Sequence, residues 1–178
     1  MKKNGTMTMM NDNVFFTSDL HLGHKFGAEV RGFSSVEEHD EAVLNGLREV
    51  MTKRTKIFFL GDVAFTRRGL EKLGEIKKGS FVLFMGNHDQ LKAVEYLKVF
   101  DDVKAFAKYR NFWISHAPIH PQEMWRCTGN IHGHIHNGAA TPPLPLPYFN
   151  VNVDFHDYHP IPFNEIKHVF EQWEKDNV

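Results

Sequence analysis

The stretch VFFTSDLH, residues 14–21, joins a short apolar run directly to an aspartate and a histidine. A short apolar run that ends in polar residues is typical of a buried strand that leads into a loop. The pattern recurs along the chain, and the expected strands are Val14–Thr17, Lys56–Leu60, Phe81–Met85, Phe112–Ser115, Asn130–His132 and Asn150–Val153. We therefore expect short buried strands whose ends carry polar side chains.

Helical patterns separate the first strands. Ser35 and Glu38 form a capping box, and apolar residues follow at helical spacing as far as Val50. Weaker helical patterns lie at 70–76, 91–97 and 166–173. Strands that alternate with helices favour β-α-β units, whereas the later strands, joined by loops, favour a mixed or antiparallel second sheet. The sequence thus predicts an α/β fold built as a sandwich of two sheets.

Length and composition indicate an ordinary globular protein. The chain has 178 residues, and domains usually contain about 100–200 residues, so we expect one domain, over 13–178. We expect residues 1–12 to be a flexible leader. Hydrophobic residues make up 42% and charged residues 24%, which excludes a disordered chain. The 21 Lys and Arg balance 22 Asp and Glu, so the chain lacks the positive field that attracts duplex DNA or anionic membranes.

The apolar runs, the cysteine count and the chain length predict where the protein resides and how it assembles. No apolar run approaches the roughly 18–20 residues that span a bilayer, so no membrane association is expected. Cys127 is the single cysteine and cannot form an internal disulfide, which fits a reducing, cytoplasmic environment. A chain of this length is also compatible with a homodimer.

Five polar clusters follow the predicted strands. They are Asp19-Leu20-His21, Gly61-Asp62, Gly86-Asn87-His88-Asp89, His116 and Gly133-His134-Ile135-His136. Because active-site groups of open α/β sheets gather beyond the carboxyl ends of strands, these loops should converge. Their nitrogen and oxygen donors are Asp19, His21, Asp62, Asn87, His116, His134 and His136. Seven donors exceed the needs of one tetrahedral ion and suit two ions that share a carboxylate.

Two of the clusters hold ligand candidates two residues apart. On extended backbone such residues point the same way, so Asp19 and His21 should reach one metal centre together. His134 and His136 can do the same, or they can be shared between adjacent centres because the chain turns there. Glycines at 61, 86 and 133 permit a positive φ or a close backbone approach at these turns.

The order of the five clusters, across residues 19–136, resembles the motifs D-x-H, G-D, G-N-H-D/E, H and G-H-x-H of the calcineurin-like metallophosphoesterase family. The opening Ser18–His24 and the Arg31–Ser35 that follows look like a small prokaryotic or phage-type branch of that family. The resemblance implies a four-layer α/β/β/α sandwich, two mixed sheets flanked by helices, and a site for two divalent metal ions. Mn²⁺ is the preferred metal, and Fe, Zn, Co and Ni also suit such ligands.

The resemblance also implies roles for individual residues. It gives one metal to Asp19, His21 and His136, and the other to Asn87, His116 and His134, with Asp62 as the bridge. His88 would protonate the leaving group and Asp89 would orient the His88 ring. We further expect His24 to contact the substrate phosphate.

The function expected from these features is hydrolysis of a phosphodiester or phosphomonoester of a small, nucleotide-like substrate by a metal-bridging hydroxide. Two divalent ions, two carboxylates and one hydroxide leave a net charge of about +1, which suits a phosphate ester. The segment Gly61–Phe65 departs from the G-D-x-x-D-R motif of protein phosphatases and argues against that activity. The alternatives are a nuclease on single strands or ends, with nucleic acid the less favoured partner, and a non-catalytic scaffold.

Overall fold

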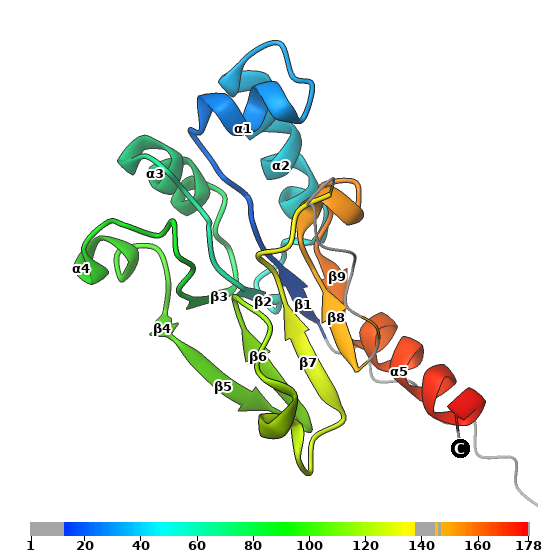
Figure 1. Cartoon of the computed structure of the whole chain (residues 1–178). Helices are drawn as coiled ribbons and strands as arrows, with labels where there is room; N and C mark the ends of the chain where they lie inside the picture. Colours follow the sequence, from blue (N-terminus) through cyan, green and yellow to red (C-terminus); the bar gives the residue numbers. More distant parts are fainter. Residues whose placement is uncertain (1–12, 138–144, 146, 178) are drawn as a thin grey trace, which may run out of the picture.

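Two β-sheets lie face to face in a computed structural model that describes residues 13–137, 145 and 147–177 (Figure 1). The expected leader at 1–12 lies outside the described residues. The first sheet has the strand order β4-β3-β2-β1-β9. Its strands are β1 (Val14–Thr17), β2 (Lys56–Phe59), β3 (Ser80–Phe84), β4 (Asp102–Lys104) and β9 (Ile161–Pro162). β1 to β4 are parallel and β9 is antiparallel to β1, so this sheet is mixed.

The second sheet has the strand order β5-β6-β7-β8 and is also mixed, because β5 is antiparallel to β6 while β6, β7 and β8 are parallel. Its strands are β5 (Phe106–Tyr109), β6 (Phe112–Ser115), β7 (Gly129–His132) and β8 (Tyr148–Asn150). The helices are α1 (Lys25–Val30), α2 (Val36–Val50), α3 (Arg67–Glu75), α4 (Ala93–Tyr96) and α5 (Phe163–Asn177), with 3₁₀ turns η1 (Pro121–Met124) and η2 (Val153–Phe155).

The central strands β1, β2 and β3 of the first sheet contribute side chains to cores on both of its faces, which explains their continuous apolar sequences. In β2, Phe58 faces the core between the two sheets, whereas Ile57 and Phe59 face the core shared with α2 and α3. Helix α5 closes the inter-sheet core: Phe163 and Phe170 both contact Phe112, with ring centroids 5.6 and 4.9 Å away. The α/β sandwich of two mixed sheets is therefore confirmed.

The second sheet is flanked more lightly than the first. The short turn η1 lies against it, where the Trp113 indole donates to the Glu123 carbonyl at 2.7 Å. Helices α2 and α3 cover the first sheet. Within the described residues, no helix is both long and apolar enough to cross a lipid bilayer.

The local sequence explains where α2 begins and why one expected strand is shorter than predicted. The Ser35 side chain accepts from the Glu38 amide and starts α2, as the capping box predicts. The expected strand Asn150–Val153 instead ends at Asn150, because the Asn150 side chain accepts from the Asn152 amide and that of Asn152 accepts from Asp154. These bonds turn the chain into η2, which carries Asp154.

Candidate metal centre

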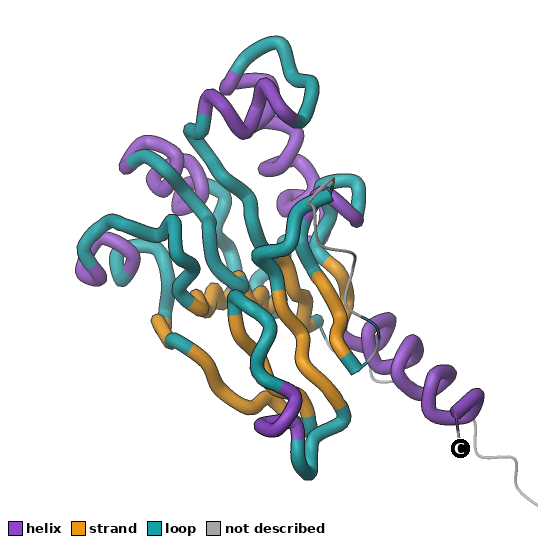
Figure 2. Tube along the Cα trace, in the orientation of Figure 1, coloured by secondary structure: helices purple, strands orange, loops and turns teal. Residues whose placement is uncertain are grey.

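The loops that follow β1 and β2 continue the pairing of the strands. The amide of Asp19 donates to the Gly61 carbonyl at 2.9 Å, and that of His21 donates to the Asp62 carbonyl at 2.9 Å. Figure 2 shows these loops leaving the same end of the sheet side by side. The hydrogen-bonded ladder therefore fixes the candidate ligands of two separate loops beside each other.

Four candidate ligands have left-handed backbone conformations. Their φ angles are 58° for Asp19, 52° for His21, 54° for Asp62 and 70° for His134. Such a conformation costs about 1–3 kcal/mol in a residue other than glycine, and it concentrates at functional sites. Asp19 and His21 thus approach each other through two tight bends, not through the extended backbone that the sequence suggested.

The first ligand group contains Asp19, His21 and His136, whose ligand atoms all lie within 4.8 Å of one another. The Nε2 atoms of His21 and His136 are 3.2 Å apart. Asp19 Oδ1 lies 3.9 Å from His21 Nε2 and 3.6 Å from His136 Nε2. One carboxylate oxygen and two imidazole nitrogens therefore converge on one point.

The second ligand group contains Asp62, His116 and His134. His116 Nε2 lies 3.4 Å from Asp62 Oδ2 and 3.1 Å from His134 Nδ1. The Asn87 amide oxygen lies 2.9 Å from the same His116 nitrogen, so the fourth expected donor is also present. His134 and His136 thus belong to different groups, which resolves the alternative that the sequence left open.

The two groups are physically connected and fit metal ions. The His134 amide donates to Asp19 Oδ2 at 2.9 Å, which links the second group to the first. Asp19 Oδ1 is buried and has no hydrogen-bond partner, although a buried polar atom is normally paired. It faces two imidazole nitrogens, and mixed nitrogen and oxygen donors suit divalent transition metals. The residues present therefore fit two metal-binding sites.

Burial and mutual charge alter the acidity of these ligands. Burial raises the pKa of Asp19 to about 6. Burial lowers the pKa of His116, but the hydrogen bond with Asp62 and the charges of Asp19 and Asp62 outweigh it and raise this pKa to about 9. Burial, Arg31 and His136 lower the pKa of His21 to about 2. Without metal, a proton therefore resides on His116 at neutral pH and not on His21.

Metal binding at the second group is expected to strengthen as the pH rises. The pKa of His116 is about 9 without metal, so binding below pH 9 must release its proton. The affinity should rise about tenfold per pH unit between pH 7 and pH 8.5. Titration calorimetry with Mn²⁺ in two buffers of different ionisation enthalpy measures the affinity and the released proton. An affinity independent of pH would contradict this prediction.

His88 and Asp89 follow β3 in the chain, and His88 is exposed whereas Asp89 is buried. The His88 ring is exposed, 6.0 Å from the His21 ring centroid, and its amide donates to Asp62 Oδ1 at 2.8 Å. The Asp89 carboxylate accepts from the amides of Asp62, Val63 and Gly86 at 2.8, 2.9 and 2.8 Å. Asp89 therefore ties two ligand loops together, which differs from the expectation that it orients the His88 ring, because backbone amides use both its oxygens.

His24 lies beside the first group but makes an aromatic contact. Its ring stacks on Phe65 with centroids 3.7 Å apart and an interplanar angle of 2°. Burial and the nearby His88 lower its pKa, so the ring is neutral at pH 7. A contact between His24 and the substrate phosphate stays a prediction.

Two residues that support the site escaped the sequence analysis. His136 Nδ1 donates to Asp154 Oδ2 at 2.8 Å, which leaves Nε2 free to face the first group. The Arg31 guanidinium donates to Asp154 at 2.7 Å and to the Asp19 carbonyl at 2.7 Å. Asp154 follows a short apolar run, as the recognised ligands do, and that signal could have found it. Arg31 opens a segment that carries the family resemblance, but nothing in that segment predicted a role at the site.

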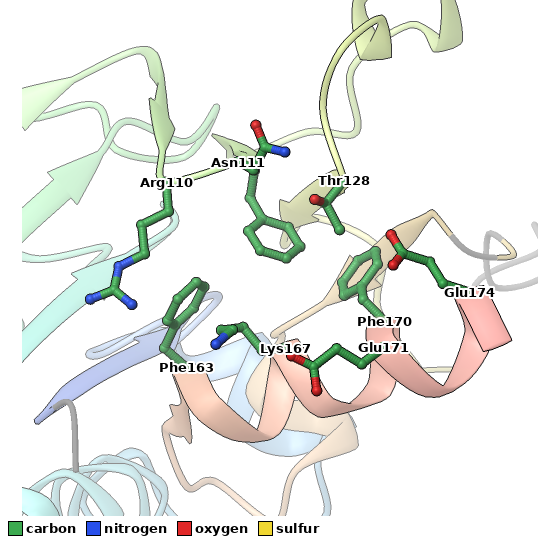
Figure 3. A pocket seen from close by; sticks show the side chains of 9 residues that line it. Arg110, Asn111, Thr128, Phe163, Lys167, Phe170, Glu171 and Glu174 are labelled. Carbon is green, nitrogen blue, oxygen red and sulfur yellow. The ribbon is translucent and has the colours of Figure 1, made fainter. Parts of the chain in front are cut away.

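Two cavities differ in their relation to this centre. One, of about 300 Å³, lies between α5 and the turn before β6, at the opposite end of the second sheet from His116. Figure 3 shows it lined by both charge signs, with Lys167 beside Glu171, and with Arg110 and Glu174 on opposite sides of the pocket. The other, of about 230 Å³, borders the first ligand group and is lined by His21 and His136. Only the second cavity adjoins the candidate metal centre.

The fold and site together define an α/β sandwich with two candidate metal-ligand groups beyond the carboxyl ends of its strands. The chain is 31% identical over 161 residues to the Gene 66 protein of Mycobacterium phage L5, a match that covers 70% of this chain and 78% of that protein. The chain therefore belongs to the family of that phage protein. No protein-family model matches it.

Two solved structures share the fold. A protein of unknown function from Aquifex aeolicus has a TM-score of 0.70 and 26% identity, covering 88% of this chain and 98% of that one. Pseudomonas putida nuclease MPE has a TM-score of 0.51 and 20% identity, covering 70% of this chain and 62% of the nuclease. The second likeness is one of fold alone.

Proposed function

We propose that this protein is a metal-dependent phosphoesterase of the calcineurin-like type, which hydrolyses a phosphodiester or phosphomonoester of a small, nucleotide-like substrate. The observation that carries the proposal is the pair of ligand groups, each with one carboxylate and two imidazoles, joined by the His134 amide and Asp19. When bound, two divalent cations, Mn²⁺ by preference, would supply positive charge for phosphoryl oxygens and acidify water. The five motifs in order and the shared fold of a nuclease support this assignment.

The chain's own residues would complete the reaction. The exposed His88 ring lies beside the first group, and the His88 amide is held by Asp62. An imidazole in this position can donate a proton to the leaving oxygen. Asp89 keeps the loops of Asp62 and Gly86 at a fixed separation. His88 thus acts as the acid, while Asp89 is a positioning residue.

The experiment is a substrate panel with and without metal. Protein stripped with a chelator and reloaded with Mn²⁺ is tested on bis-p-nitrophenyl phosphate, p-nitrophenyl phosphate, 2′,3′-cyclic nucleotides and a single-stranded oligonucleotide. We expect turnover of a small ester that appears only after Mn²⁺ is added. Protein that binds two equivalents of metal and hydrolyses none of these substrates would overturn the proposal in favour of a non-catalytic scaffold.

A nuclease is the second candidate, because nuclease MPE shares this fold. Phosphate contacts along a strand make binding strongly salt-dependent. Oligonucleotide hydrolysis that exceeds small-ester hydrolysis and falls steeply between 50 and 200 mM salt, a range over which phosphate contacts weaken, would favour this alternative.

Replacing His88 by Gln is expected to reduce kcat for a 2′,3′-cyclic nucleotide by about 100-fold without loss of bound metal. The loss should be much smaller for bis-p-nitrophenyl phosphate, because p-nitrophenolate leaves without a proton. Steady-state kinetics and metal analysis of the same samples test both statements. His168→Gln, an exposed histidine on α5, is the matched control. Equal losses on both substrates would exclude His88 as the acid.

A further inference from the structure

The cavity of about 230 Å³ beside the first ligand group has a mainly apolar and aromatic wall. Aromatic and apolar side chains from α1 and from the loop after β2 line it, namely Phe26, Val30 and Phe65, together with His24 and His88. Its polar boundary is formed by His21 and His136 of the first ligand group. A substrate phosphate at the metal groups would therefore have an apolar recess next to it.

One wall of the recess is a pair of exposed apolar side chains on α1. Phe26 and Val30 are 67% and 68% exposed. They are four residues apart in the helix, so both lie on one face, and both line the cavity. Apolar side chains gathered at a cavity are a mark of a ligand site, whereas single exposed ones need no explanation.

A second wall of the recess is a stack of rings. Phe65 lies parallel to His24, with centroids 3.7 Å apart, and stacks on His88 at 5.1 Å. The His24 ring is also 6.3 Å from that of Phe26, so the two walls meet at His24. A flat group that enters the recess finds aromatic surfaces from both elements.

The recess is held in place by backbone and buried contacts. A Cβ at Gly27 would lie 2.8 Å from His24 Nδ1, so glycine lets α1 pack close to that ring. Arg31 follows α1, and its amide donates to the Gly27 carbonyl while its guanidinium donates to Asp154 and to the Asp19 carbonyl. Arg31 thus links the α1 wall to Asp154 and to the Asp19 backbone at the candidate metal centre. The recess is therefore largely formed before a ligand binds.

Charge argues against a second phosphate in this recess. Arg31 is the single Lys or Arg among the residues that line it. Its guanidinium is already used by Asp154, by His39 and by the carbonyls of Asp19 and Leu20. The volume is below the roughly 300–1,000 Å³ of drug-sized ligand sites, so it suits one ring system.

We infer that this recess binds the nucleobase of the substrate, stacked against Phe26 and the Phe65 wall, while the phosphate lies at the metal groups. The inference rests on the proposed phosphoesterase function and narrows its substrate to an ester that carries a planar heteroaromatic base. Stacking of a base on an aromatic side chain changes binding by roughly 5- to 150-fold.

The test compares two diesters with the same leaving group. Thymidine 5′-(p-nitrophenyl phosphate) and methyl p-nitrophenyl phosphate both release p-nitrophenolate, so the ratio of their kcat/KM values reports on the thymidine group alone. We expect the wild-type Mn²⁺ protein to favour the thymidine ester by about tenfold or more. Phe26→Ala should reduce this ratio about tenfold, whereas Phe106→Ala, 63% exposed on β5 and outside the recess, should leave it unchanged.

A second measurement needs neither metal nor hydrolysis. Saturation-transfer NMR of thymidine with chelator-treated protein should show binding that Phe26→Ala abolishes and Phe106→Ala retains. If both esters are hydrolysed equally and thymidine does not bind, the recess inference is overturned and the phosphoesterase proposal stands. If neither ester is hydrolysed, the phosphoesterase proposal fails, and thymidine binding alone decides whether the recess accepts a base.

Discussion

Replacing Asp62 by Asn is expected to reduce hydrolysis by more than about 1,000-fold. Asp62 Oδ2 lies 3.4 Å from His116 Nε2, and its Oδ1 accepts from the His88 amide at 2.8 Å. Asn removes the only carboxylate of the second ligand group and also the charge that raises the pKa of His116. Even changes next to a ligand typically cost 10- to 100-fold in metal affinity, so loss of a candidate ligand itself should cost more.

Asp157→Asn is a matched control for the Asp62→Asn variant. Asp157 also has a left-handed backbone, with a φ angle of 48° compared with 54° for Asp62, and it is exposed. Asn tolerates that conformation well, so neither substitution should disturb the backbone. We expect Asp157→Asn to keep wild-type activity and two bound metals. An Asp62→Asn protein that keeps both metals and full activity would remove Asp62 from the site.

Replacing Arg31 by Ala is expected to destabilise the protein by about 3–5 kcal/mol, the usual cost of removing one partner from a buried ion pair. The Arg31 side chain is only 7% exposed, and the Asp154 side chain against it is 11% exposed. The change would leave Asp154 with His136 alone and would leave the Leu20 and Asp19 carbonyls without this donor. The lost contacts are those to the Asp19 backbone and to Asp154, the partner of His136, so the destabilised region includes residues of the first ligand group.

Urea unfolding of chelator-treated protein measures this loss without interference from metal. Lys25→Ala is the matched control, because Lys25 is 83% exposed and its pair with Glu29, at 3.9 Å, is a surface pair. We expect the control to change the free energy of unfolding by less than about 0.5 kcal/mol. If the two variants unfold at the same urea concentration, the Arg31 network contributes nothing measurable to stability.

Local sequence predicts the central elements of this fold well. The apolar runs that become β1, β2 and β3 pack into cores on both faces of their sheet, β6 packs Phe112 and Ile114 into one core, and the capping box starts α2 where expected. The short strands β4, β5 and β9 were missed. β9 has two residues, Ile161 and Pro162, and it exists because β1 offers an edge, which no local pattern encodes.

The residues of the two candidate ligand groups could be predicted, but their geometry could not. The motifs named the residues that form both groups, yet the left-handed bends at Asp19 and His21 depend on the pairing of two loops distant in sequence. Arg31 was missed for a similar reason, because it acts through a backbone carbonyl that only the folded chain brings to it. Asp154 carries the local signal of the recognised residues, but its contact with His136 also exists only in the folded chain. The partners of Asp89 are likewise amides from two separate loops.

The continued pairing of the β1 and β2 loops has a consequence for how ions enter and leave. Residues of a hydrogen-bonded ladder open as one cooperative unit. The amides of Asp19, His21 and Leu22 extend that ladder. The Asp89 carboxylate accepts from the amides of Asp62 and Gly86 and so connects the ladder to the loop after β3. These ligands cannot swing outward without melting the sheet beside them. Any ion held there would therefore exchange on the side where Asn87 and His134 are exposed, and not by movement of the loop that carries Asp19 and His21.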